Sequence, residues 1–586
     1  MTRRAWWGLL AGTAVGTAVL VGALQGIIGA IRHVVLHDFI WLSRDYVWMT
    51  PLGNLVLFLA AVVPLGLLGM VWPRVRDGRV AGFVFGTLAA LTLVLLVPGL
   101  HHLAGLAVAA GMGTRLAAWL GGGTDASARA AWLRRAGVRV GALLLLVGIG
   151  REAWARRSSA QQIAALPTAV GDAPNVIVII LDTVRAASMS FLGYGRATTP
   201  RLAVFGAEGA VFEQAWSTAP WTLPSHAGML TGRYPSQTST NWRSPLDGAV
   251  PTLAEALGAR GYRTAGFAAN HFYTSYESGL TRGFAEYADY RRTAKQVLLS
   301  TTLTQTNLFW SLLHGHGVAP RLRDLMRMDL RLQTMWTSDR KLASHVTTEF
   351  LEWQAGVSGR PFFAFLNLYD AHLPYDPPAP WRTQFAAEPT ELDRYDAGIA
   401  YMDEKLGAMF DSLRTRGVLD RTLVVISSDH GEGFGEHGLH GHGNSLYRTE
   451  LHVPLIVRYP ARIPAGLRVT AATTLRDLSA TVLDVAGARA GAPSLPGTSW
   501  LQLIAGNAGS AVVSEVSAGV NAEPHHPVSR GAMRSLVSDS AHYIRNGDGV
   551  EELYHWRTDP AESVDQSRSS SAALATWREW LTRALR

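Results

Sequence analysis

Four short apolar runs constrain the fold of this 586-residue chain more than any other feature of its sequence. Runs of this length that are rich in β-branched and aromatic residues are typical of strands buried on both faces of a sheet. They are Val176–Leu181, Arg263–Ala268, Phe362–Leu368 and Thr422–Ser427. Between the last two, apolar residues recur at helical spacing, namely Ile399, Met402, Leu406, Met409, Phe410 and Leu413. The sequence therefore predicts an α/β domain with a largely parallel sheet.

Each apolar run is followed directly by polar residues of the kinds that bind metals or carry protons. These residues are Asp182 after the first run, Asn270 and His271 after the second, Asp370 and His372 after the third, and Asp429 and His430 after the fourth. A single Asp or His in such a place is commonly only a turn former or a helix cap. In parallel α/β sheets, however, the ligand site lies at the carboxyl ends of the strands, so four such ends together favour one constructed site.

The first part of the chain reads as membrane-spanning. Ala5–Ala30 carries no charged residue and exceeds the about 20 residues that cross a bilayer. Further candidate spans are Pro51–Val71, Val80–Leu100, Leu103–Leu120 and, with its flanks, the short Val138–Ile149. We expect residues 1–155 to form a transmembrane region of about five helices, with 156–174 as a linker.

Arginine placement predicts the orientation of these spans. The loop around Arg76 and the loop around Arg134 both lie inside if five spans begin from a cytoplasmic N-terminus. The rest of the chain is then extracytoplasmic, on a multi-pass protein of the cell membrane. Arg151, Arg156 and Arg157 oppose this reading, because with four spans they and the large domain would lie inside. Arg115 is the ionisable residue deep in a span, which favours a plain anchor over a substrate path.

Composition excludes several other classes of protein. The chain has no cysteine, so it has no disulfide framework and no thiolate metal site. Its formal charge of +8 could suggest nucleic acid as a partner. Much of the arginine stands beside apolar segments, however, so we expect a lipid bilayer and no nucleic acid.

Thr222 stands out between the first two runs, in the sequence APWTLPSHAGMLTGRYPSQ. A helix-compatible stretch begins at His226, and Pro224 suits a first helical turn. A hydroxyl at a helix N-terminus meets free backbone N–H groups, which favour an alkoxide and a bound oxyanion. The alternative is that Thr222 is only an N-cap.

From Asn175 onwards the sequence resembles the sulfatase branch of the alkaline phosphatase superfamily. The motifs are NVIVIILDTVR, GYRTAGFAANHF, PFFAFLNLYDAHLPY, SSDHGEGFGEHGLHGHG and HVPLIV, in this order. The family signature, Cys or Ser followed by any residue, Pro, Ser and Arg, falls on Thr222–His226. The resemblance implies an alkaline-phosphatase-like catalytic domain over 175–490. It also implies a small antiparallel subdomain over 491–586, which contains EELYHWRTDPAES.

The resemblance also implies a site with one divalent ion, of Ca, Mg, Mn or Zn. Asp182, Asp429 and His430 match its ligands, with Thr222 at or near the ion as nucleophile; a hard cation accepts these donors and lowers the pKa of a coordinated hydroxyl. His372 and His442 match positions that contact the transferred group or protonate the leaving oxygen. His226, Asn270 and His271 stand where the family binds substrate. Glu436, His437 and His440 either support the site, form a further metal site or are ordinary surface residues.

Two departures bear on the substrate. Threonine cannot become formylglycine, so we expect no formylglycine and no sulfate hydrolysis through an aldehyde hydrate. His226 also replaces the family Arg, and His442 replaces a Lys. A threonine with accessory histidines resembles the membrane-anchored phosphotransferases that act on lipids, and the architecture resembles the lipoteichoic acid synthases, although Asp182 stands where those typically have Glu.

These features predict a hydrolase or transferase of phosphate or sulfate esters that works through Thr222, with phosphoryl-type transfer on a lipid or cell-envelope substrate favoured. The alternatives are a true sulfuric ester hydrolase on sulfated glycans or lipids, and a noncatalytic membrane protein that retains the fold. The region Tyr290–Gln354, with apolar stretches Leu298–Leu313 and Leu322–Trp336, is expected to pack against the sheet, or else to form a lid or rest on the membrane surface.

Overall fold

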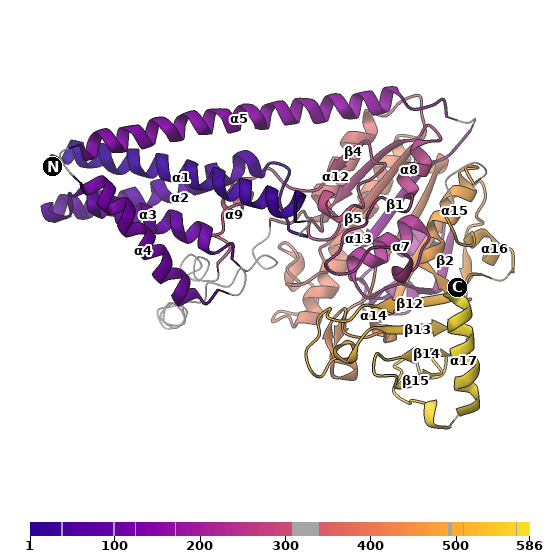
Figure 1. Cartoon of the computed structure of the whole chain (residues 1–586). Helices are drawn as coiled ribbons and strands as arrows, with labels where there is room; N and C mark the ends of the chain where they lie inside the picture. Colours follow the sequence, from indigo (N-terminus) through magenta and orange to yellow (C-terminus); the bar gives the residue numbers. More distant parts are fainter. Residues whose placement is uncertain are drawn as a thin grey trace. The chain divides into compact units, whose positions relative to one another are not determined.

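The computed structural model describes residues 1–36, 39–97, 100–122, 125–169, 172–306, 339–489, 495–507, 509–569 and 571–585 (Figure 1). The chain forms two compact units. The first contains Met1–Ser158 and Tyr290–Asp339, and the second contains Ser159–Asp289 and Arg340–Arg586.

The first unit contains a helix at each of the five predicted apolar segments. The helices are α1 (Arg3–Val34), α2 (Tyr46–Val71), α3 (Gly78–Val94), α4 (His102–Gly121) and α5 (Ala126–Ala164). Among the described residues, α1, α2 and α4 are long and apolar enough to cross a membrane, whereas α3 has only 17 residues and α5 is rich in charge. Helix α5 also continues into the segment 156–174 that we expected to be a linker.

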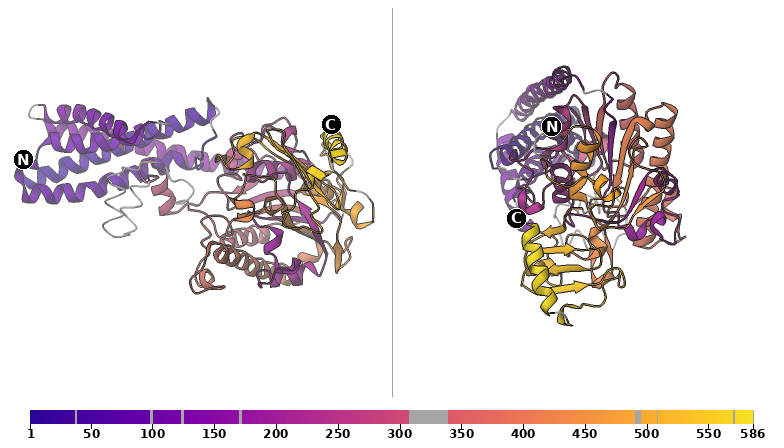
Figure 2. Two further views of the ribbon diagram at one scale, coloured as in Figure 1. Left: turned by 90° about the horizontal axis from the view of Figure 1, so that it is seen from below. Right: turned by 90° about the vertical axis from the view of Figure 1, so that its right-hand side faces the viewer.

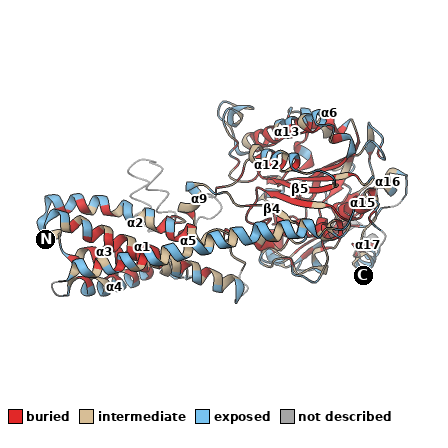
Figure 3. Ribbon diagram, turned by 90° about the horizontal axis from the view of Figure 1, so that it is seen from above, coloured by how far each residue is buried: buried red, intermediate tan, exposed pale blue. Residues whose placement is uncertain are grey.

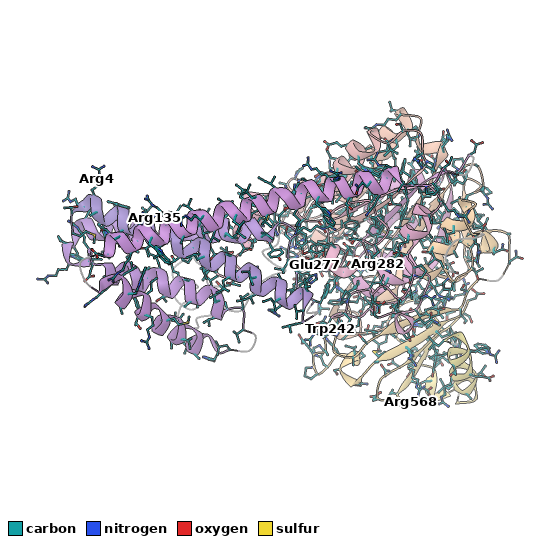
Figure 4. The ribbon with its side chains drawn as sticks, turned by 45° about the horizontal axis from the view of Figure 1, so that its top comes forward. Arg4, Arg135, Trp242, Glu277, Arg282 and Arg568 are labelled. Atoms are coloured by element: carbon teal, nitrogen blue, oxygen red, sulfur yellow. The ribbon has the colours of Figure 1, made fainter. Side chains whose placement is uncertain are left out.

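Small residues bring these helices into close contact. Gly69 of α2 lies against Trp6 of α1, and Gly16 of α1 lies against the backbone of Leu133 in α5. Glycine allows such an approach because it has no Cβ. The contact of Gly78 with Ala126 joins the start of α3 to the start of α5. The start of α1, the α2–α3 link and the start of α5 thus meet at the arginine-rich end of the unit, where Arg4 and Arg135 are labelled in Figure 4.

Residues 290–306 belong to the first unit, so the expectation that Tyr290–Gln354 packs against the sheet was wrong for this part. It is confirmed for α12 (Ala343–Ala355), which buries Ala343, Val346 and Phe350 in the core of the sheet. Within residues 290–306, helix α9 (Ala294–Leu299) is followed by Ser300, whose carbonyl accepts a hydrogen bond from Gln25 Nε2 at 3.2 Å. Thr302 donates to the carbonyl of Thr92 at 2.7 Å. A buried side chain of α1 and a backbone carbonyl of α3 therefore pair with this segment. Leu322–Trp336 and the later part of Leu298–Leu313 lie outside the described residues.

The second unit is built on a nine-stranded sheet with the order β10-β2-β9-β6-β1-β5-β3-β4, with β11 paired to β2. The four predicted runs are neighbouring parallel strands at its centre, namely β1 (Asn175–Leu181), β3 (Arg263–Ala268), β5 (Phe362–Leu368) and β6 (Thr422–Ser427). The others are β2 (Ala210–Trp216), β4 (Glu286–Ala288), β9 (His452–Arg458), β10 (Leu467–Val469) and β11 (Thr473–Thr474). Only β9 runs antiparallel to its neighbours among these described strands. The predicted α/β class is confirmed.

Helices cover both faces of this sheet, as Figures 1 and 3 show. One face carries α6 (Pro200–Gly206), α12 (Ala343–Ala355) and α13 (Glu391–Thr415). The other carries α7 (Thr222–Thr231), α8 (Leu253–Gly258) and α15 (Leu478–Val485). The predicted stripe from Ile399 to Leu413 lies on α13 and is buried in the core with alternate residues of β1, β5 and β6. The burial of both faces explains why the strands read as unbroken apolar runs.

The predicted antiparallel subdomain is present at the C-terminal end (Figure 2, right). Its four strands are β12 (Val512–Val516), β13 (Met533–Val537), β14 (His542–Arg545) and β15 (Glu551–Tyr554). Helix α17 (Ser571–Ala584) buries Leu574, Trp577 and Leu581 against them. Smaller elements are α14 (Arg448–Leu451), α16 (Trp500–Ile504) and the pair β7 (Gly433–Phe434) and β8 (His440–Gly441).

Candidate active site

Thr222 is the first residue of α7, and Trp221 takes the N-cap position. The alternative in which Thr222 is the N-cap is therefore wrong. The helix begins four residues before His226, because the amide of Ser225 already bonds to the carbonyl of Trp221 at 3.1 Å. Pro224 is tolerated in this first turn because its missing N–H would have had no helical partner. The Thr222 side chain is buried at the end of the helix that carries unpaired backbone N–H groups.

Two buried acids come from neighbouring strands. Asp182 directly follows β1, and Asp429 follows β6. Oδ2 of Asp182 accepts from Nδ2 of Asn270 at 2.9 Å and from Nδ2 of Asn367 at 3.1 Å. Oδ1 of Asp429 accepts from the amides of Thr183 and His430, both at 3.0 Å. Each acid is thus held rigidly through one oxygen.

The second oxygen of each acid is the one suited to a metal. Among the described residues, Asp182 Oδ1 and Asp429 Oδ2 are buried without a hydrogen-bond partner. The ligand atoms of Asp182, Asp429 and His430 all lie within 4.8 Å of one another. Two carboxylates and an imidazole form a donor set that divalent ions accept. The residues present therefore fit one divalent ion.

Electrostatics supports the same reading. Burial, and then the charge of Asp429, raises the pKa of Asp182, and burial also raises the pKa of Asp429. A cation between two such acids would offset the cost of burying their charges. Burial lowers the pKa of His430 to about 3, which keeps its imidazole neutral and able to bind a metal.

The Thr222 hydroxyl lies beside this group. Its Oγ1 is 3.4 Å from Nε2 of His430 and 3.5 Å from Nδ2 of Asn270. Asn270 therefore contacts both Thr222 and Asp182. His226 lies beneath the same turn, with Nδ1 at 2.8 Å from the Thr222 carbonyl and 3.6 Å from Oδ2 of Asp429. Burial lowers the pKa of His226, so this imidazole is neutral.

His372 and His442 lie next to each other, with ring centres 5.2 Å apart, and His442 is 4.3 Å from the ring of His430. Nδ1 of His442 is 2.9 Å from Oε1 of Glu432. Burial alone would lower the pKa of His442, but the charge and hydrogen bond of Glu432 outweigh it and raise the pKa to about 9. Burial, and then the proximity of His442, lowers the pKa of His372. The pair thus combines a protonated and a neutral imidazole.

Other residues that the sequence singled out have contacts of their own. Burial lowers the pKa of His271 to about 4, and its ring lies on Phe272. Asp370 accepts from the amide of Ala343 at 2.9 Å and so holds the start of α12. Glu436 pairs with Arg185 at 2.6 Å, and His437 stacks on Tyr447, while His440 is exposed in β8. Among the described residues, Glu436, His437 and His440 do not bring their ligand atoms together as a metal site would require.

Sequence reasoning missed two residues that support the site, Glu432 and Asn367. Glu432 follows the Asp429-His430-Gly431 turn, but its partner His442 lies ten residues further on, so no local spacing linked them. Asn367 had left a signal. It interrupts an apolar run, is fully buried, and a buried amide in a strand needs hydrogen-bond partners.

Comparison with known proteins agrees with this fold. A family model described as Sulfatase matches residues 174–488. That range is more than half of the chain, and the chain belongs to the sulfatase family.

Relatives are distant. The chain is 26% identical over 365 residues to the choline-sulfatase of Rhizobium meliloti, covering 54% of this chain and 68% of the relative. It is 24% identical over 368 residues to the arylsulfatase K of Bos taurus, covering 54% of this chain and 63% of the relative. The chain thus spans less than two thirds of the bovine protein. The phosphonate monoester hydrolase of Agrobacterium radiobacter has a similar fold, with a TM-score of 0.54 and 20% identity over 70% of this chain and 95% of that one.

Proposed function

We propose that this chain is a metal-dependent ester hydrolase or transferase in which Thr222 is the nucleophile. One observation carries the proposal: Oγ1 of Thr222 lies 3.4 Å from Nε2 of His430, one of three residues whose ligand atoms gather within 4.8 Å. A divalent ion held by Asp182, Asp429 and His430 would activate this hydroxyl and polarise the oxygens of the transferred group.

The side chains around Thr222 have separable roles in this proposal. Asn270 fixes the hydroxyl relative to Asp182, because its amide contacts both. The free N–H groups at the start of α7 stabilise charge on the transferred group. Nδ1 of His442 is taken by Glu432, so Nε2 is the atom that gives a proton to the leaving oxygen.

The reaction balances as a displacement. Oγ1 of Thr222 forms a bond to phosphorus or sulfur while the bond to the leaving oxygen breaks, and the hydroxyl proton of Thr222 passes to water. His442 protonates the leaving oxygen. Water, or an acceptor alcohol in a transferase, then bonds to the phosphorus or sulfur while the bond to Oγ1 of Thr222 breaks. The attacking oxygen gives its proton to Nε2 of His442, and Oγ1 regains from water the proton that it lost.

Phosphoryl-type transfer on a lipid or cell-envelope substrate is the favoured form of this proposal. A threonine cannot carry the aldehyde that lets formylglycine expel sulfate, whereas a threonine hydroxyl is a competent phosphoryl acceptor. The apolar helices of the first unit also support a lipid or cell-envelope substrate, because they would hold the chain at a membrane. Sulfate ester hydrolysis is the second candidate, and the relatives named arylsulfatase K and choline-sulfatase favour it.

We further propose a multi-pass protein with its second unit outside the cytoplasm. The helices α1 to α5 alternate in direction if all five cross the bilayer. The arginine-rich starts of α1, α3 and α5 then share the cytoplasmic side, as the contacts of Gly69 with Trp6 and of Gly78 with Ala126 support.

A test uses the full chain in detergent with an aryl phosphodiester and an aryl sulfate as paired substrates. We expect turnover of the phosphodiester, a phosphate-bearing adduct on the Thr222 peptide by mass spectrometry, loss of both in Thr222→Ala, and partial recovery in Thr222→Ser. Turnover of sulfate alone would replace the first candidate by the second. Full activity in Thr222→Ala would overturn the role of Thr222. If the parent protein turns over neither substrate and the Asp429→Ala variant still binds metal, a noncatalytic role is favoured.

A further inference from the structure

A second group of metal-binding side chains lies on the loop that follows β12. Glu523, His525 and His526 bring one ligand atom each within 4.8 Å of the others. The rings of the two histidines have centres 4.3 Å apart, and Nδ1 of His525 is 3.8 Å from Oε2 of Glu523. We propose that these three residues form a second divalent-metal site, of the zinc-binding class.

The donor set distinguishes this site from the first. Two imidazole nitrogens and one carboxylate oxygen are typical of Zn²⁺ sites with three protein ligands, in which the fourth position is left to water. The group around Thr222 has more oxygen donors, which suits harder ions. The two sites should therefore differ in their preference among metals.

His526 is buried, and one of its ring nitrogens has a backbone partner. It is only 5% exposed, and its Nδ1 contacts the carbonyl of Asn521. Histidine ligands commonly donate one ring N–H to a backbone carbonyl, which leaves the lone pair on the other nitrogen for the metal. The amide of Glu523 approaches the same Nδ1 at 3.4 Å, and a proton on Nδ1 would be donated to the Asn521 carbonyl.

The other two ligands are accessible to an ion from solvent. The side chains of His525 and Glu523 are 60% and 67% exposed. Pro524 and Pro527 bracket the histidines and restrict the backbone between them. Fewer backbone conformations are then lost when the three side chains gather on an ion.

The loop that carries this group also supports His442. Nδ2 of Asn521 donates to the His442 carbonyl at 3.0 Å, while the carbonyl of Asn521 contacts His526. Asn521 itself has a φ of 37°, a conformation that costs free energy in a residue other than glycine. A metal on His526 would hold Asn521, and hence His442, in place. This consequence for His442 rests on the proposed function, whereas metal binding by the loop does not.

The test measures zinc binding by the full chain, purified without a histidine tag. In an Asp182→Asn, Asp429→Asn protein the first site is disabled, so catalysis plays no part in the readout. We expect this protein to bind one equivalent of Zn²⁺ by calorimetric titration and by elemental analysis. His525→Asn in the same background should weaken binding at least tenfold, and Glu523→Gln should weaken it less. His555→Asn is the matched control, because His555 is an exposed histidine outside this loop.

Hydrogen exchange supplies a second readout in the otherwise unchanged chain. Zinc should slow amide exchange in residues 517–526 of the parent and of His555→Asn, but not of His525→Asn. Equal zinc affinity in the parent and in His525→Asn, or no zinc-dependent protection of this loop, would overturn the proposal. Unfolding temperatures of all variants establish that loss of binding does not reflect loss of fold.

Discussion

The side-chain amide of Asn270 donates to Oδ2 of Asp182 at 2.9 Å, and this bond joins the end of β3 to the end of β1. The same nitrogen lies 3.5 Å from Oγ1 of Thr222. The uncharged Asn270 thus connects Asp182, a candidate metal ligand, to Thr222, the candidate nucleophile. Asn270 carries neither a charge nor a transferable proton. Its replacement therefore tests how the nucleophile is positioned, without removing a group that takes part in the reaction.

Replacement of this amide should affect catalysis more than metal binding. Asn270→Ala removes a hydrogen bond to a buried acid, of the kind that contributes about 1.5–3 kcal/mol, so we expect kcat/KM to fall by roughly 10- to 100-fold. Elemental analysis should show that the metal is retained. Asn507→Ala is the control, because Asn507 is exposed and distant in sequence from the site. Unchanged kcat/KM in Asn270→Ala would contradict the positioning role.

Glu432 should act through His442. Glu432→Gln keeps the shape of the side chain but removes the charge at 2.9 Å from Nδ1 of His442. We expect kcat to fall at least tenfold for a substrate with a poor leaving group, and much less for one whose leaving oxygen needs no proton. The ratio of the two rates is the measurement. An equal loss with both substrates would show that Glu432 has another role.

Asp370 provides a test of stability against pH. Burial raises its pKa from the ordinary 3.8 to about 7, so the folded chain binds a proton more tightly there than the unfolded chain does. This carboxyl therefore stabilises the fold less as pH rises through that interval, and its full cost is present above pH 7. Asp370→Asn should gain in unfolding temperature relative to the parent between pH 4 and 7, and the difference should level off above that. A difference independent of pH would exclude a titrating Asp370.

The packing of α1 can be tested with two glycines of one helix. A Cβ on Gly16 would lie 2.5 Å from the backbone of Leu133, whereas a Cβ on Gly8 would meet no described atom within 4 Å. Gly16→Ala should lower the unfolding temperature in detergent by separating α1 from α5. Gly8→Ala should be neutral or slightly stabilising, because alanine favours a helix by about 1 kcal/mol over glycine. The same response in both variants would contradict this helix pairing.

The sequence predicted the central sheet almost residue by residue, and the reason is physical. Strands β3, β5 and β6 are buried on both faces, so each reads as an apolar run, and the run ends where buried polar residues of the site begin. The acids Asp182 and Asp429 followed from the same pattern, because parallel strands deliver their ends to one edge. Such contacts as Glu432 with His442 could not be predicted, since a turn and a hairpin of unknown course separate them. The packing of residues 290–306 in the first unit could not be predicted either. Hydrophobic periodicity shows that one face of a segment is apolar, but it does not show which part of the chain covers that face.

The return of residues 290–306 to the first unit changes how the molecule can be divided. The chain passes between the units near residues 158, 289 and 339, so three covalent crossings join them. A shortened protein that begins at Ser159 would still carry α9 and the buried Thr302, stripped of Gln25 and Thr92. To be soluble in isolation, the second unit would then need the removal of Tyr290–Asp339 as well as of the N-terminal helices. A single protease cut near residue 158 should likewise leave the halves attached.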